Sequence, residues 1–127
     1  MKRISVRGII RTDKGLATIF RRKNGVEYYV IPGGGVENSE NLEEALRREL
    51  REELNIEVNI KGLAFKTETD DRVEYFYECE YVSGNFTLNG EELDRMNENN
   101  YYEPTFLDLK DVNNVSLQKE VQDYLSK

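Results

Sequence analysis

Apolar residues that alternate with polar ones recur along the chain and predict a series of β-strands, because this spacing gives a strand one buried and one exposed face. The Asn24-Gly25 pair lies between two such segments and favours a tight hairpin, since both central residues of a type I′ turn need positive φ. Pro32 and the three glycines after it should end the third strand. The predicted strands cover residues 4–11, 16–22, 28–31, 56–66, 72–82 and 105–109.

Two segments have the spacing of a helix instead. Leucine recurs at every fourth position between Glu40 and Leu54 and predicts an amphipathic helix there. A second helix is predicted from about residue 115, with Val121 on its apolar face. The polar, asparagine-rich stretch 89–100 is predicted to be a loop. This order of elements predicts an α+β fold in which helices cover a sheet.

Length and composition limit the classes of protein that the chain can represent. Its 127 residues are typical of one domain, so we expect a single domain over residues 1–127. The apolar runs are too short to span a bilayer and the first residues do not resemble a signal peptide, so we expect a cytoplasmic protein without a membrane partner. The single cysteine, Cys79, fits a reducing compartment. Because the sequence has no histidine and one cysteine, a histidine-based catalytic triad and a structural zinc site are both excluded.

Charge is distributed unevenly along the chain. The formal net charge is −7, yet residues 1–23 carry eight basic side chains and one acidic one. Residues 34–56 carry seven glutamates and three arginines. An acidic protein binds nucleic acid poorly, so we expect no nucleic-acid partner. The basic and acidic segments together suit an anionic ligand bridged by a metal cation, although the same pattern also fits an ordinary solvated surface.

Three glutamates near the end of the first predicted helix oppose helix stability. Glu49, Glu52 and Glu53 are three and four residues apart, and each like-charged pair costs about 0.2–0.5 kcal/mol. They also lie in the C-terminal turns, where the helix dipole disfavours anions. Such a cost is expected at a functional site, and a bound Mg²⁺ would offset it because that ion prefers carboxylate oxygens. The alternative is an exposed acidic face that neighbouring arginines neutralise.

The spacing around these glutamates resembles the signature motif of the Nudix hydrolases. That motif is a glycine, then a glutamate after five residues, then Arg-Glu-aliphatic-x-Glu-Glu-x-Gly-aliphatic after seven more. Asn55 stands where the family has its second glycine. Asparagine enters the left-handed conformation more readily than most residues, so Asn55 should still end the helix. The matching residues are Gly34, Glu40, Arg48, Glu49, Leu50, Glu52, Glu53 and Ile56.

The resemblance implies a Nudix fold, in which a mixed sheet is sandwiched between helices, and a hydrolase that uses Mg²⁺ or Mn²⁺. Members of the family cleave a diphosphate bond in a nucleoside diphosphate linked to another group. By resemblance, Glu49, Glu52 and Glu53 are metal ligands and catalytic residues, and the choice of general base among them stays open. Arg48 joins the catalytic set by holding Glu49 or a neighbouring carboxylate, and Glu40 supports the start of the helix.

Two further metal ligands are expected outside this helix. The resemblance implies a backbone carbonyl near Gly34 and an acidic residue from a later loop. Within the polar stretch 89–100, Glu92 is the candidate that we choose, with Glu91 and Glu98 as alternatives. Each of these glutamates also fits a plain solvated loop.

Basic and aromatic side chains supply candidates for substrate binding. Arg7, Arg21 and Arg22 are candidates for phosphate contacts, because a guanidinium fits phosphate through two hydrogen bonds. Since neighbouring residues on a strand face opposite ways, at most one of Arg21 and Arg22 should reach the site. Tyr28 and Tyr102 are candidates for stacking on a base.

The sequence leaves the substrate open. A nucleoside triphosphate is favoured, with ADP-ribose or a nucleotide sugar as alternatives, and a non-catalytic module that senses a nucleotide is the second class of function. The intact glutamates favour the enzyme, because a sensor has no need of such a costly cluster. The expected partner is a small-molecule nucleotide. The oligomeric state is open, with a homodimer as one option.

Overall fold

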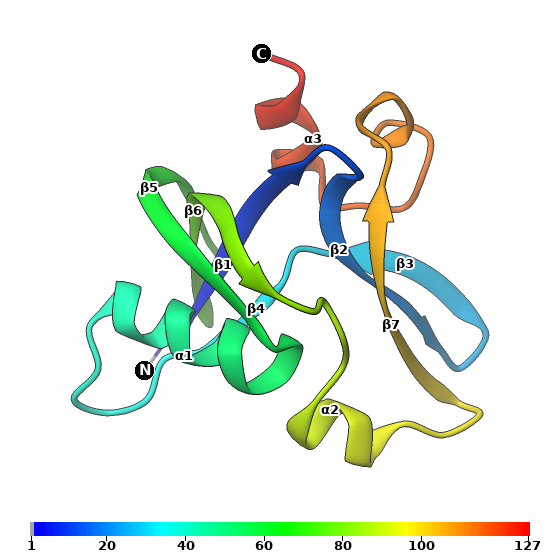
Figure 1. The fold of residues 1–127 in the computed structure, drawn as a ribbon, viewed down its shortest axis with the longest axis horizontal. Coiled ribbons are helices and arrows are strands. Elements are labelled where there is room, and N and C mark those ends of the chain that lie inside the picture. The colour runs from blue at the N-terminus through cyan, green and yellow to red at the C-terminus, as the bar shows by residue number, and fades with distance from the viewer. Residues whose placement is uncertain (1) are drawn as a thin grey trace.

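The structure, a computed structural model, describes residues 2–127, with the side chains of residues 91 and 92 outside the description. Figure 1 shows α1 and α3 on opposite sides of the strands. Of the described helices, none is long and apolar enough to cross a membrane. The elements in chain order are β1 (Arg3–Thr12), β2 (Gly15–Lys23), β3 (Val26–Val30), β4 (Gly33–Gly35), α1 (Leu42–Leu54), β5 (Ile56–Glu68), β6 (Arg72–Gly84), α2 (Gly90–Arg95), β7 (Asn100–Leu107), a 3₁₀ turn (Leu109–Asp111) and α3 (Lys119–Leu125).

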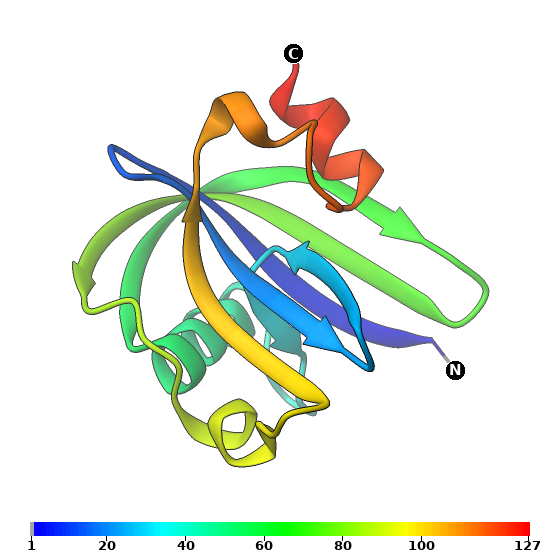
Figure 2. The same cartoon turned by 90° about the vertical axis from the view of Figure 1, so that its right-hand side faces the viewer.

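β1 is the central strand of a mixed sheet. It pairs in parallel with β6, from Arg3 opposite Arg72 to Ile10 opposite Cys79, and β6 pairs antiparallel with β5. β1 also pairs antiparallel with β4. A second group of strands, in the order β3, β2, β7, joins β1 through the β1–β2 hairpin. Figure 2 shows β2 and β7 side by side along their length.

The sheet separates two hydrophobic cores. Ile10 shares one core with Leu46 and Leu50 of α1, whereas Ile9 shares the other with Val121 of α3. Ile9 and Ile10 are neighbours on β1, and they face opposite ways as strand geometry requires. The predicted α+β arrangement, with a mixed sheet between helices, is therefore confirmed.

Several local predictions are also confirmed, with small shifts of boundary. Asn24 and Gly25 have φ values of 51° and 84°, as the predicted hairpin turn needs. α1 begins at Leu42, two residues later than predicted, because Asn41 caps it. α3 begins at Lys119, after an irregular segment that starts near residue 112.

One strand was not predicted, and two predictions of elements are wrong. Residues 33–35 form β4, because glycine lets them approach β1 so closely that a Cβ on Gly33 would lie 1.9 Å from the Val6 carbonyl oxygen. The predicted loop at 89–100 contains α2, whose six residues are too few to give a periodic signal. β7 begins at Asn100 instead of 105, because it pairs with β2 over its full length.

Candidate active site

Helix α1 is fixed at both ends by asparagine. At its start, the Asn41 side chain accepts a hydrogen bond of 2.8 Å from the Glu44 amide. At its end, Asn55 is left-handed, with φ 60° and ψ 37°, and its amide donates to the Arg51 carbonyl. The prediction that Asn55 ends the helix as glycine would is confirmed. Because both ends of α1 are fixed and leucines such as Leu50 are buried, the backbone that carries the glutamates of the last turns is held in one position.

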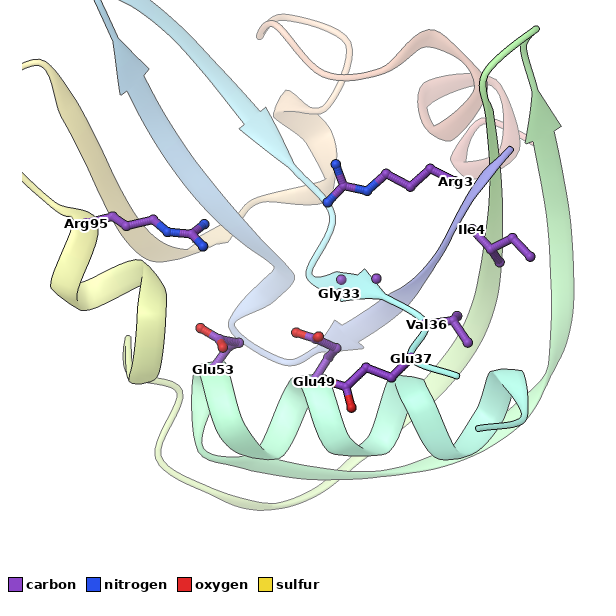
Figure 3. A pocket seen from close by; sticks show the side chains of 10 residues that line it. Arg3, Ile4, Gly33, Val36, Glu37, Glu49, Glu53 and Arg95 are labelled. Carbon is purple, nitrogen blue, oxygen red and sulfur yellow. The ribbon is translucent and has the colours of Figure 1, made fainter. Parts of the chain in front are cut away.

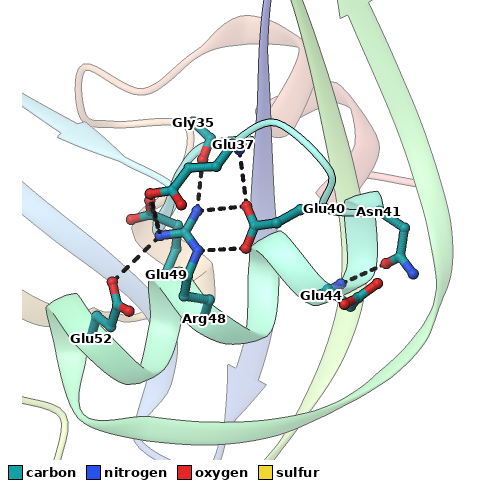
Figure 4. A network of polar contacts seen from close by, with 8 residues as sticks. All are labelled: Gly35, Glu37, Glu40, Asn41, Glu44, Arg48, Glu49 and Glu52. Atoms are coloured by element: carbon teal, nitrogen blue, oxygen red, sulfur yellow. Dashed lines mark hydrogen bonds and ion pairs between the residues drawn. The ribbon is translucent and has the colours of Figure 1, made fainter.

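Arg48 connects α1 to the segment that precedes it (Figure 4). Its guanidinium donates two hydrogen bonds of 2.6 and 2.9 Å to the Glu40 carboxylate and one of 3.1 Å to the Gly35 carbonyl. It also donates to Glu49 at 3.0 Å and to Glu52 at 3.4 Å. The hydrogen bonds to Glu40 raise the pKa of Arg48, and they lower the pKa of Glu40. The predicted contact with Glu49 is present, but Glu40 is the stronger partner.

Glu49 and Glu53 point from α1 into a cavity of about 420 Å³ (Figure 3). Opposite them runs the glycine backbone of β4, and a Cβ on Gly34 would lie 2.4 Å from the Glu49 carboxyl carbon. A larger residue at this position would displace the Glu49 carboxylate from where it lies. The Glu49 side chain is 15% exposed, and this burial raises its pKa while Arg48 opposes the rise.

The segment after β6 packs on the end of α1. The Asn89 amide donates to the Glu53 carbonyl at 2.7 Å, and the Thr87 amide donates to the Leu54 carbonyl at 3.2 Å. These are two of the carbonyls that a helix leaves without partners at its C-terminus. A Cβ on Gly90 would lie 3.1 Å from a Glu53 carboxylate oxygen, so the start of α2 lies against this side chain. No pattern in the sequence predicts this packing.

Glu52 does not share the cavity with its two neighbours. Its side chain is 57% exposed, and its carboxylate contacts Arg48. Among the described side chains, no three acidic, cysteine or histidine groups are gathered as a metal site. Like charges repel and a guanidinium attracts, which accounts for the position of the Glu52 side chain, and its role as a metal ligand stays a prediction.

Glu49 and Glu53 nevertheless fit a divalent cation. They place carboxylate oxygens, which hard cations prefer, in one shared cavity. Burial, and to a smaller extent the charges of Glu53 and Glu52, raise the pKa of Glu49, and a cation would offset these costs. The β4 backbone at Gly34 lies beside the same carboxylate. The roles of these residues as metal ligands stay predictions.

The fourth acidic ligand stays a prediction as well. The side chains of Glu91 and Glu92 lie outside the described part of the structure, although both residues belong to α2. Glu98 is exposed in the turn before β7.

A second cavity, of about 230 Å³, adjoins the first, and Gly33 and Glu53 line both. Tyr102 also lines it, together with the aliphatic side chains of Ile19 and Val30. The arginines that line it are Arg3 and Arg7 on β1, Arg21 on β2 and Arg95 on α2. The structure therefore places a cluster of guanidinium groups beside the two glutamates.

Arg21 and Arg22 face opposite sides of β2, as strand alternation predicts. The Arg21 guanidinium lies 4.0 Å from the ring centroid of Tyr102 and 5.7 Å from that of Tyr28. Arg22 instead contacts the Glu27 carboxylate at 3.2 Å. Arg21 and Tyr102 therefore line the cavity and Arg22 does not, in line with the expectation that at most one of the two arginines reaches the site. Tyr28 packs beside Arg21 and is not among the residues that line the cavity.

Arg3 and Arg95 are site residues that the sequence analysis missed. Arg3 lies four positions before Arg7 on the same strand, and residues an even number apart share a face, so this spacing was an available signal. Arg95 gave none, because α2 brings it to the site through tertiary packing.

The family of the chain follows from a match to a known domain. The model of the NUDIX domain matches residues 1–124. The chain belongs to the Nudix family. Nudix hydrolases generally use divalent metals, which agrees with the paired carboxylates of this Nudix protein. No curated protein sequence matches it.

Solved Nudix structures share its fold. A NUDIX hydrolase from Nitrosomonas europaea has a TM-score of 0.74 at 12% identity, covering 99% of this chain and 87% of its own. MutT NUDIX hydrolase from Burkholderia pseudomallei has a TM-score of 0.73 at 23% identity, with coverages of 99% and 97%. An ADP-ribose pyrophosphatase from Streptococcus suis has a TM-score of 0.69 at 15% identity, with coverages of 99% and 91%. At these identities the likeness concerns the fold alone.

Proposed function

We propose that this Nudix protein is a pyrophosphohydrolase that depends on Mg²⁺ or Mn²⁺ and acts on a nucleoside triphosphate. The observation that carries the proposal is the pair of adjoining cavities in which Glu49 and Glu53 lie beside four arginines. A polyphosphate is strongly anionic, so it needs guanidinium groups on its oxygens and a metal ion between it and any carboxylate. These cavities offer both kinds of contact.

The residues of the site have distinct tasks in this reaction. A bound divalent ion supplies neutralisation of phosphate charge and a lower pKa for the attacking water. Glu49 and Glu53 would hold the ion, with Glu52 turning inward, and one of these carboxylates would accept the proton of the water. Arg48 would keep Glu49 oriented, while the arginines of the second cavity would hold the phosphates in line for attack.

Two observations support this choice of function. The glutamates of α1 carry a cost in repulsion that a nucleotide sensor would not need, which supports an enzyme. ADP-ribose and nucleotide sugars carry two phosphates flanked by sugars, so four lining arginines suit a triphosphate better.

The test is a product assay over common nucleoside triphosphates and diphosphates, ADP-ribose and a nucleotide sugar, each with Mg²⁺ and with Mn²⁺. We expect the triphosphates to be hydrolysed fastest, and we expect a chelator to abolish the reaction. Faster hydrolysis of ADP-ribose than of every triphosphate would contradict the proposed substrate. Hydrolysis of none of these compounds would contradict the proposed enzyme.

Metal binding has a readout that does not depend on turnover. Because ligands that bind the native state raise its stability, Mn²⁺ should raise the Tm of the wild-type protein. A Glu49→Gln/Glu53→Gln variant should lose this increase, while a Glu43→Gln/Glu44→Gln variant in the first turn of α1 should keep it. An equal increase in all three proteins would place the ion elsewhere.

A further inference from the structure

Arg21 occupies the position from which a nucleobase would stack on Tyr102. Its guanidinium carbon lies 4.0 Å from the ring centroid, and its Nη2 donates to the Asn100 side chain on β7. Arg21 and Tyr102 are also paired across β2 and β7, so the backbone holds the two side chains together. A base entering the second cavity would have to displace this guanidinium before it could stack.

Most of the remaining polar side chains of the second cavity, those of Arg3, Arg7 and Arg95, are also hydrogen-bond donors, and the Glu53 carboxylate, which the first cavity shares, is an acceptor. Arg7 is held by the Glu74 carboxylate at 3.3 Å and by the Ile31 carbonyl at 3.2 Å, and it faces the same space as Arg21. Figure 3 shows Arg3 and Arg95 reaching toward the two glutamates from opposite sides. A guanidinium donates hydrogen bonds and accepts none, whereas the edge of a base presents both kinds of group. Phosphate oxygens, which only accept, match this cavity better.

The other end of the first cavity has a different character. The side chains of Ile4, Val36 and Glu37 line it there, on the far side of Glu49 from Arg95, and Arg3 starts beside Ile4 on β1 and extends away from this end (Figure 3). The Glu37 side chain is 71% exposed, so it is not fixed by packing. Two aliphatic side chains and one exposed carboxylate, which contacts Arg48 at 3.7 Å, provide little means of distinguishing one base from another.

We propose that the second cavity binds the terminal phosphates of the substrate and that the nucleoside lies at the Ile4–Val36 end of the first cavity. This inference rests on the proposed function and adds to it the feature of the nucleotide that the enzyme selects. The number of phosphates decides which compounds are hydrolysed, and the identity of the base has little effect. Tyr102 is then a positioning residue, which acts on the substrate through Arg21.

Binding of inorganic tripolyphosphate, which has no base, tests the cavity. The titration is done by calorimetry with Mg²⁺ in a Glu53→Gln background, where we expect hydrolysis to be slow. Arg21→Gln and Arg3→Gln should each weaken binding about tenfold, as expected for the loss of about 1.4 kcal/mol of contact. Arg22→Gln, the matched change on the opposite face of β2, should leave the affinity unchanged. Arg3 is exposed, so its replacement tests the cavity even where Arg21→Gln disturbs folding.

Replacement of Tyr102 distinguishes most sharply between a cavity that binds phosphates and a cavity that binds the base. If Tyr102 positions Arg21, Tyr102→Leu should weaken tripolyphosphate binding and leave the order of preference among bases unchanged. If it stacks on the base, tripolyphosphate binding should be unaffected and base preference should change, which would overturn the inference.

Steady-state kinetics test the inference independently of the binding experiments. We expect kcat/KM to vary by less than about tenfold among triphosphates of different bases, and to fall by about a hundredfold or more when the terminal phosphate is removed. Discrimination of about a hundredfold among bases, or equal use of diphosphates and triphosphates, would overturn the inference. Absence of hydrolysis with every metal would instead contradict the proposed function, while the tripolyphosphate titration would still decide what the cavity binds.

Discussion

The helices on the two faces of the sheet are held in different ways. α1 has 13 residues, a side-chain N-cap, a left-handed end at Asn55 and several buried apolar residues. α3 has seven residues, makes no side-chain N-cap bond within the described structure, and buries Val121. Both helices also bond to other segments: α1 through Arg48 and the Asn89 amide, and α3 through Gln122 and Tyr124. The more firmly held helix is the one that carries the glutamates.

This difference shows what is needed to hold charged side chains in a fixed position. α3 covers an apolar core, and the hydrogen bonds of Gln122 and Tyr124 fix it to neighbouring segments without holding like charges together. α1 must hold like-charged carboxylates beside a strand backbone, against the repulsion between them. Directional hydrogen bonds at both of its ends meet that requirement, so replacing residues on the two faces should have unequal effects on activity.

The largest difference in kcat between variants of the two helices is expected when a glutamate is replaced. Glu53→Gln should lower kcat by about a thousandfold, equivalent to about 4 kcal/mol, because the amide loses the charge that holds metal. The Tm of the metal-free variant should be equal to or higher than that of wild type, since a repulsion is removed. Glu120→Gln in the first turn of α3 is the control, and it should change kcat less than twofold. Survival of Glu53→Gln activity within about tenfold would contradict the assignment of this site.

Core truncation should separate stability from activity. Leu50 and Val121 are both fully buried, one beneath each helix. Leu50→Ala should lower the free energy of unfolding by about 3 kcal/mol, and Val121→Ala by about 2 kcal/mol, as measured by urea denaturation. Under conditions where both variants are folded, we expect kcat to fall for Leu50→Ala alone, because Glu49 and Glu53 flank that turn. Equal losses of kcat would show that the α3 face also positions the site.

Arginine replacements on α1 should distinguish the anchored side of that helix from its exposed side. Arg48→Lys loses the two-bond contact with Glu40, so we expect a loss of about 1–2 kcal/mol in stability together with a lower kcat. Arg47 makes one exposed ion pair at 3.5 Å with Glu43, and Arg47→Lys should change stability by less than about 0.5 kcal/mol. Thermal melts and steady-state assays of both variants test the contrast.

The smallest effect on stability near neutral pH is expected at Cys79, which lies in the core beneath α1. Burial raises the pKa of its thiol to about 12, so the thiol stays neutral in the native state near pH 9, whereas it ionises there in the unfolded state. The unfolded state then binds fewer protons, and stability should fall as pH rises from about 9 toward 12. Cys79→Ala should show a shallower fall over this range. Alkylation at pH 8.5 should be slow until α1 opens, and rapid labelling of native protein would contradict this burial.

Sequence periodicity was sufficient for the parts of the molecule that local rules determine. The leucine spacing in α1, the Asn24-Gly25 turn and the left-handed Asn55 each follow from the preferences of a few adjacent residues. The opposite orientations of Arg21 and Arg22 follow in the same way from strand alternation. The resemblance to the Nudix motif, and not periodicity, pointed to Glu49 and Glu53, which both line the first cavity.

Contacts between distant segments could not be predicted in this way. Arg95 reaches the cavity because α2 packs on the end of α1, and a six-residue helix in a polar stretch has no periodic pattern. Glu52 has the same helical spacing as its partners, but the attraction of Arg48 turns it toward solvent. The short β4 depends on how closely glycine backbones approach β1, which only the fold reveals.

The cap that residues 87–90 place on the end of α1 limits how the chain can be engineered. An epitope tag or a fused domain inserted there would separate the Thr87 and Asn89 amides from the helix, and it would impair catalysis without unfolding the sheet. The exposed turn at Asp70 between β5 and β6 is the safer position for a label or an attachment point.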